Sequence, residues 1–159
     1  NNYNKIENWF FERIINFKTI PIPGDGNLIT QLGHVSDLTD AMINCINYDK
    51  TKNNIYNCSG DKGITIKGLI FKCAEACNID KTKIELKEFE YKNLDPKSKK
   101  GFPLRLSHYQ TSITKLKSDM NWEPKFDLLN GLRNSFENDF KYKKNNPIDT
   151  SNDYQLFKS

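Results

Sequence analysis

The residues best suited to chemistry gather in one stretch of the chain, residues 97–109. This stretch holds four cations followed by two rings: Lys97, Lys99, Lys100, Arg105, His108 and Tyr109. Cations that follow a phosphate backbone, with rings that stack on bases, are how proteins hold single-stranded nucleic acid. The plainer alternative is a solvated lysine loop followed by a core phenylalanine and a buried tyrosine. The stretch therefore predicts contacts with single-stranded nucleic acid at these six residues, with the structural alternative left open.

Catalytic groups are sparse elsewhere in the chain. Neither His34 nor His108 lies beside a Ser, Cys or carboxylate in a known nucleophile motif. His34 with Asp37 would suit an acid/base pair, but a strand end and a helix cap explain the two residues equally simply. Residues 24–26, Gly-Asp-Gly, lack the spacing of a phosphate-binding loop and predict a turn. No convincing pair of carboxylates suits a metal-dependent nuclease, so we predict no metal site and leave the catalytic residues unknown.

Charge and composition narrow the class of protein. The 159 residues carry 24 basic and 20 acidic side chains, a net charge of +4 that permits nucleic-acid binding without demanding it. Lys, Asn and Ile are abundant, as AT-rich codons favour, so we discount the lysine runs and give more weight to the three arginines, Arg105 above all. No apolar run approaches the ~20 residues that span a bilayer. The 12% aromatic content argues against wholesale disorder.

Two other features bear on the kind of chain. It begins without Met, which predicts a cut or processed piece of a longer protein. The four cysteines lack the C-x-x-C spacing of a zinc or redox motif, which favours small buried hydrophobes in a reducing intracellular compartment.

The apolar periodicity predicts the elements that position these residues. Helices are expected over 5–17, from Ser36 to 46, and over 65–77, 112–120 and 128–141, with Ser36 and Asp127 as caps. Extended segments are expected at 20–23, 28–35, 55–58, 84–91 and 102–106. The sum is an α/β fold, helix-rich, with short strands. Several strands have the character of edge pieces of a sheet whose other members are absent.

Read in order, five fragments resemble the C-terminal half of extended short-chain dehydrogenases, the nucleotide-sugar epimerases and dehydratases. The fragments are Pro21–Gly26, His34–Leu38, Tyr56-Asn57, Asn121–Pro124 and Asn130–Leu132. The resemblance implies the C-terminal, substrate-side part of a Rossmann-like fold over residues 1–140. Residues 141–159 would be a polar, irregular tail, and the N-terminal Rossmann half would be absent.

Four stretches are more specific and resemble the chloroplast stem-loop RNA-binding proteins, plastid relatives of the epimerases. They are Glu7–Arg13, Thr30–Val35, Asn57–Gly60, and Lys99–Arg105 with His108. The resemblance implies a plastid protein that binds structured or single-stranded RNA. It also implies mRNA binding, rRNA processing or RNA stabilisation, and an endoribonuclease activity. Homo- or hetero-oligomers and a cleft shared with the absent half are expected, with Thr30, Gln31 and His34 as cleft candidates and no membrane partner.

Departures from the enzyme pattern decide between the hypotheses. Nucleotide-sugar enzymes carry Arg-Asp where this chain has Thr30-Gln31, and Thr offers no charged fork to a diphosphate. The Gly-rich dinucleotide loop and the Tyr-x-x-x-Lys pair are not in these 159 residues. No cofactor is therefore expected in this chain, and the NAD(P) site would lie in the absent half. RNA binding is the leading hypothesis. A nucleotide-sugar epimerase or dehydratase is the alternative, and a piece that serves mainly in assembly is the third.

Overall fold

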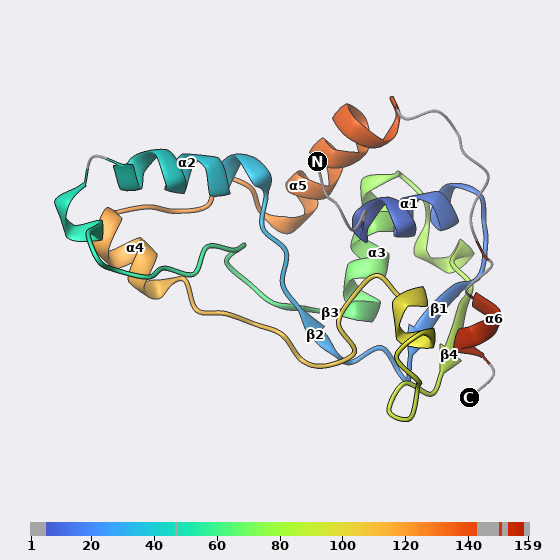
Figure 1. Cartoon of the computed structure of the whole chain (residues 1–159). Helices are drawn as coiled ribbons and strands as arrows, with labels where there is room; N and C mark the ends of the chain where they lie inside the picture. The colour runs from blue at the N-terminus through green and yellow to red at the C-terminus, as the bar shows by residue number, and fades with distance from the viewer. Residues whose placement is uncertain (1–5, 47, 143–149, 151–152, 158–159) are drawn as a thin grey trace.

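The computed structural model describes residues 6–46, 48–142, 150 and 153–157. Its elements form two parts, a helical body and a thinner arm, which are joined by several segments that are largely irregular (Figure 1). The body contains α1 (Ile6–Ile15), α3 (Ile66–Ala76) and α5 (Leu128–Ser135), which runs into a π turn, η4 (Phe136–Phe140). The arm contains α2 (Val35–Ile46) and α4 (Thr114–Met120). Short 3-10 turns follow at η1 (Asp49–Thr51), η2 (Lys81–Lys83) and η3 (Ser98–Gly101).

Two small sheets complete the body. Strand β1 (Ile20–Pro23) pairs in parallel with β4 (Leu86–Phe89), in a register that sets Ile20 opposite Leu86. Strand β2 (Ile29–Thr30) pairs antiparallel with β3 (Ile64–Thr65). Between β1 and β2, Gly24 and Gly26 take φ values of +51° and +79°, which confirms the predicted turn. The mixture of helices with few strands confirms the predicted α/β class.

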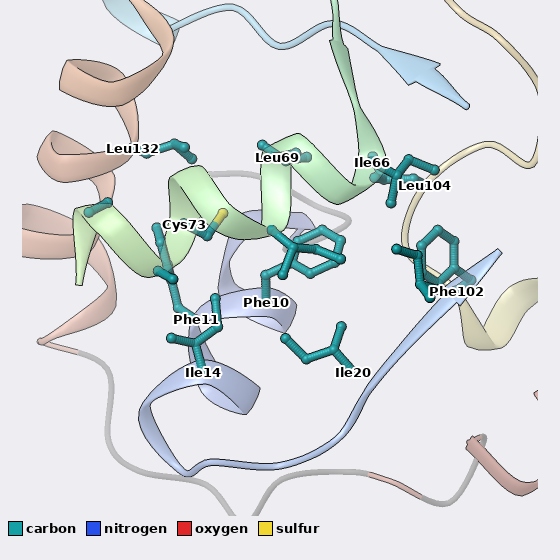
Figure 2. Close-up of a cluster of buried hydrophobic side chains, with 14 of the residues drawn as sticks. Phe10, Phe11, Ile14, Ile20, Ile66, Leu69, Cys73, Phe102, Leu104 and Leu132 are labelled. Carbon is teal, nitrogen blue, oxygen red and sulfur yellow. The ribbon is translucent and has the colours of Figure 1, made fainter. Parts of the chain in front are cut away.

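Aromatic and aliphatic side chains from α1 and α3 fill the core of the body. Figure 2 shows Phe10, Phe11 and Ile14 of α1 facing Leu69 and Cys73 of α3. All five are almost completely buried. Their spacing is the helical periodicity that predicted both elements, and burying each such side chain stabilises the fold by about 1.5–3 kcal/mol.

The start of α2 differs from the prediction. The helix begins at Val35, so Ser36 lies inside it and the capping group is the ring of His34, whose Nδ1 accepts a hydrogen bond from the Ser36 N–H at 3.2 Å. Asp37 is 3% exposed, and its carboxylate accepts hydrogen bonds from the N–H groups of Lys125 (2.9 Å) and Phe126 (3.3 Å). Asp37 therefore joins the arm to the chain before α5, because a buried carboxylate needs such donors. By contrast, Asp127 caps α5 as predicted, accepting from the Asn130 N–H at 2.8 Å.

The arm has a small core of its own and one open helix face. Ala41, Ile113, Leu116 and Trp122 are buried together between α2 and α4. On the other side of α2, Leu38, Met42 and Ile46 are 45%, 61% and 76% exposed. The predicted strand at 55–58 does not form, and Ile55 is 90% exposed. A strand needs a partner to receive its hydrogen bonds, and among the described residues none pairs with this segment.

This open face predicts unusual tolerance of α2 to polar substitution. We expect Met42→Gln with Ile46→Gln to change the free energy of unfolding by less than about 0.5 kcal/mol, because neither side chain is buried in the chain. Urea unfolding followed by circular dichroism measures the effect. A loss of several kcal/mol would show that this face is covered in the folded chain.

All four cysteines are free thiols; Cys73 is buried in the main core as predicted, whereas Cys45, Cys58 and Cys77 are only partly buried. Burial, and to a smaller degree the charge of Glu137, raises the pKa of Cys77 to about 12 from its ordinary 9.0. The folded chain thus holds this proton where the unfolded chain loses it. The contribution of Cys77 to the free energy of unfolding is therefore fully present below about pH 9. It is lost as the pH rises toward the folded-state pKa.

We therefore expect the parent chain to lose more stability than Cys77→Ala between about pH 8 and about pH 11. Urea unfolding of both proteins under reducing conditions checks this. The two curves of stability against pH share every other titrating group, so an equal fall would contradict the assignment.

Part of the described chain after residue 141 is helical. Helix α6 (Asp153–Leu156) lies in the part of the chain expected to be an irregular tail, and Leu156 is fully buried in the main core. The expectation of an irregular tail is therefore wrong for these residues, since one leucine and one charged pair suffice to dock a short helix. Within the described ranges, none of the helices has the length and apolarity to cross a membrane.

Candidate nucleic-acid interface

The lysine loop is a short 3-10 turn fixed by an aspartate. The Asp95 carboxylate accepts hydrogen bonds from the Ser98 hydroxyl and from the backbone N–H groups of Ser98 (3.2 Å) and Lys97 (2.8 Å). The Ser98 hydroxyl first, and then these backbone donors, lower the pKa of Asp95. Ser98 is buried, while Lys97, Lys99 and Lys100 are exposed and take part in no ion pair among the described residues. The turn therefore presents three ammonium groups to solvent.

The chain after η3 is anchored by Phe102 and Leu104, both buried in the main core. The Phe102 ring contacts Trp9, Phe89 and Phe10, with centroid distances of 5.7, 5.5 and 6.4 Å. Residues 102–106 form no regular strand, so the predicted extended segment has no ladder partner. These anchors leave the next side chain, Arg105, exposed.

The structure brings Arg105, His108 and Tyr109 together beside β2. The Arg105 guanidinium lies over the Tyr109 ring, 4.6 Å from its centroid, and Tyr109 is 38% exposed. The Tyr109 N–H donates to the carbonyl of Ile29 (2.8 Å), and the Ile29 N–H donates to Nδ1 of His108 (3.1 Å). Arg105 makes no ion pair within the described part of the chain, whereas Arg13 and Arg133 both do. Of the plainer alternative, the solvated lysine loop and the core Phe102 are both present, and only the buried tyrosine is wrong.

Two of the predicted cleft residues are buried. Thr30 is 8% and Gln31 is 6% exposed. The Gln31 amide donates to the Gly60 carbonyl (2.7 Å), and its oxygen accepts from the Thr111 N–H (2.7 Å). Gln31 thus ties the chain just after Tyr109 to β2. No sequence signal announces this role, because it depends on two segments that are 29 and 80 residues away.

The third cleft candidate, His34, lines a cavity of about 590 Å³ between α1, α2 and α5. Its ring stacks on Phe126 with a centroid distance of 3.8 Å, and its Nε2 lies 3.2 Å from the Asn134 side-chain oxygen. The other lining residues include the carboxylates of Glu7, Asp127 and Asp139 and no lysine or arginine. Carboxylates concentrated in one cavity repel a polyanion. This cavity is therefore a poor place for a phosphate chain.

A second hollow, of about 500 Å³, is lined mainly by residues that follow Tyr109 in the chain. No sequence pattern predicts this mostly polar hollow. Its lining residues are Asp61, Gln110, Thr111, Ser112, Ile113, Thr114 and Lys117. Lys117 pairs with Asp61 and Glu123, both at 2.7 Å, and the hydrogen bonds to these carboxylates raise its pKa. The Gln110 amide makes no hydrogen bond within the described part of the chain, which leaves it available to a ligand.

Metal and dinucleotide sites find little support in this part of the fold. Across the described ranges, no group of three or more His, Cys, Asp and Glu side chains is placed to hold a metal ion. The Gly24–Gly26 turn leads into β2 and not into a helix. A dinucleotide loop needs a helix there, because the helix N-terminus receives the pyrophosphate. The Gly24–Gly26 turn therefore does not have the arrangement of a dinucleotide-binding loop.

Comparison with solved structures defines the class of fold. The chain superposes on UDP-glucose 4-epimerase from Thermotoga maritima with a TM-score of 0.59, 24% identity and 78% of this chain covered. It superposes on a Bacillus anthracis dTDP-glucose 4,6-dehydratase, solved with NAD, with a TM-score of 0.61, 19% identity and 87% covered. The matches span 35% and 40% of those chains. The chain therefore has the fold of a C-terminal portion of the extended short-chain dehydrogenases.

Comparison of sequences is more specific. No protein-family model matches the chain. Over 139 residues the chain is 40% identical to the chloroplast stem-loop binding protein of 41 kDa b from Arabidopsis thaliana. The match covers 87% of this chain and 36% of that chloroplastic relative. The chain is thus similar to a chloroplast stem-loop binding protein, as the sequence resemblance predicted, and it spans about a third of that relative's length.

Proposed function

We propose that this chain is the RNA-contacting, C-terminal portion of a plastid stem-loop RNA-binding protein. The observation that carries the proposal is the group formed by Arg105, His108 and Tyr109, which β2 holds at the surface with a charged and an aromatic side chain already in contact. Lys97, Lys99 and Lys100 precede it along the same loop and add exposed positive charge. The stem-loop binding relative supports the choice of RNA, with mRNA binding and rRNA processing as the expected contexts.

The nucleotide-sugar alternative has weaker support at the residue level. Its solved neighbours are less than 25% identical to this chain, which supports the shared fold only. Thr30 carries no charge for a diphosphate, and the amide of Gln31 is already engaged with Gly60 and Thr111. An endoribonuclease activity would need reacting groups that we do not assign to any residue here.

The salt dependence of RNA affinity tests the proposal. Each phosphate contact that is lost should flatten the slope of log affinity against log salt by about 0.7 for single-stranded RNA. We expect Lys99→Ala, Lys100→Ala and Arg105→Ala together to weaken binding and to reduce the slope by roughly 2. Fluorescence anisotropy with a labelled stem-loop RNA measures both quantities.

The matched control removes the same charge elsewhere. Lys50, Lys81 and Lys83 are exposed on η1 and η2 and form no ion pair among the described residues. Replacing these three by Ala should leave the slope closer to that of the parent. Equal effects of the two triple variants would mean that net charge, and not the proposed surface, determines binding. Unchanged affinity and slope in the first variant would refute the site.

A further inference from the structure

Residues 105–112 are a surface segment that the body holds at three points. The Tyr109 N–H donates to the Ile29 carbonyl at 2.8 Å, and the His108 ring accepts from the Ile29 N–H at 3.1 Å. The Gln31 side-chain oxygen accepts from the Thr111 N–H at 2.7 Å. Because the backbone N–H groups of Tyr109 and Thr111 and the ring of His108 are held by Ile29 and Gln31, the exposed side chains of this segment have little freedom to lose when a ligand binds.

Arg105 and Tyr109 form a cation–π pair on this segment. The guanidinium carbon lies 4.6 Å from the ring centroid, within the range of a cation–π contact. The guanidinium is planar, and among the described residues no carboxylate pairs with it. A planar cation fixed over one ring leaves its other face for a second flat group, and bases stack on arginine planes as well as on aromatic rings. Bases inside a duplex are already stacked, so this pair suits an unpaired base.

His108 supplies a directed donor beside the pair. Its Nδ1 accepts the Ile29 N–H, so the proton of the neutral ring lies on Nε2. Such an N–H donates to a phosphate oxygen, a ribose hydroxyl or a base carbonyl, each of which RNA offers.

The polar hollow of about 500 Å³ adjoins the pair through Gln110, the residue after Tyr109. The Gln110 carboxamide, unbonded within the described part of the chain, carries both donors and an acceptor. Ser112 and Thr114 add hydroxyl groups to the same lining. Mixed donors and acceptors next to a stacking surface read the edge of a base that is not paired.

We propose that Arg105, Tyr109, His108 and the Gln110 hollow form a site for one unpaired nucleotide, in the loop or a bulge of a stem-loop RNA. This inference rests on the proposed RNA-binding function and narrows it: Lys99, Lys100 and the charge of Arg105 hold the phosphate chain, and the face of the guanidinium, together with Tyr109, selects RNA with an unstacked base. The site therefore discriminates between a looped and a fully paired RNA, which the lysines alone do not.

The test compares two RNAs and a charge-conserving variant. The RNAs are a hairpin with a long unpaired loop and a blunt duplex of the same base composition. Arg105→Lys keeps the positive charge and removes the planar stacking surface. We expect it to weaken hairpin binding about tenfold, with the salt slope and the duplex affinity nearly unchanged. Tyr109→Leu should act in the same direction, and Lys99→Ala with Lys100→Ala should weaken both RNAs alike.

The outcomes distinguish failure of the nucleotide site from failure of the proposed RNA-binding function. If the parent binds neither RNA, the proposed function fails. Two results would refute the nucleotide site alone, provided that the parent binds both RNAs. In the first, Arg105→Lys keeps the hairpin affinity within about twofold of the parent. In the second, it lowers the affinities for hairpin and duplex equally. Arg105 and Tyr109 are exposed, and unfolding curves for both variants should match the parent, so a loss of fold does not imitate the expected result.

Discussion

Replacing Phe102 by Ala should lower the free energy of unfolding by about 3–5 kcal/mol, because it leaves a cavity where three aromatic rings meet. Phe102 is 4% exposed and contacts the rings of Trp9, Phe10 and Phe89 from α1 and β4. The same ring anchors the chain between the lysine turn and Arg105. The variant should therefore weaken RNA binding as well as stability, although Phe102 itself has no place in the RNA contact.

Urea unfolding and RNA titration of the same protein preparations measure the two effects. Phe102→Leu keeps most of the volume and should recover much of the stability and the binding. Ile55→Ala removes a side chain that is 90% exposed and should stay within about 0.5 kcal/mol of the parent. A Phe102→Ala chain as stable as the Ile55 control would contradict the packing of this loop against the core.

Replacing Asp153 by Ala should cost about 3–5 kcal/mol, because it removes the carboxylate that pairs with a buried guanidinium. Arg13 is 1% exposed, its Nη2 lies 2.7 Å from the Asp153 carboxylate, and its guanidinium also lies 3.6 Å from the centroid of the Trp9 ring. The change should also loosen α6, since it removes the ion pair that helps to dock this helix beside the buried Leu156.

Unfolding curves give the loss of stability, and hydrogen exchange of residues 153–157 reports the release of α6. The control is Lys72→Ala, which removes an exposed pair with Glu75 at 2.7 Å and should cost no more than about 0.5 kcal/mol. A variant of Asp153 that behaves like this control would mean that the Arg13 pair is not the attachment of the C-terminal region.

The core helices could be predicted because each one buries a single apolar face inside the chain. In α3 the apolar spacing and the buried residues coincide, whereas α1 also buries Asn8 and Arg13 and leaves Phe17, expected in its apolar stripe, 60% exposed. In α2 they do not: its apolar stripe is as regular, yet Leu38, Met42 and Ile46 face outward. Periodicity shows that a face is apolar but not which partner covers it. The same limit explains segment 55–58, which has the composition of a strand and no neighbour among the described residues.

For the site, the sequence identified the residue types but not their arrangement. Arg105, His108 and Tyr109 were chosen together because they are close in the chain. The contact of His108 with Ile29, 79 residues away, is what places them on a defined surface. Thr30 and Gln31 were predicted to line a cleft from a family pattern, and both are buried. The sequence does not show whether an uncharged glutamine binds a ligand or two backbone groups. Only the fold distinguishes these roles.

Photo-crosslinking of a bound stem-loop RNA, with the attachment points located by mass spectrometry, tests the central claim most directly. The RNA carries a photoreactive base in its loop and, in a second version, in its stem. We predict that the crosslinks fall in the segment from Lys97 to Tyr109, with those from the loop base at its C-terminal end, near Arg105 and Tyr109. Crosslinks confined to the acidic cavity around His34, or to the outer face of α2, would contradict the account.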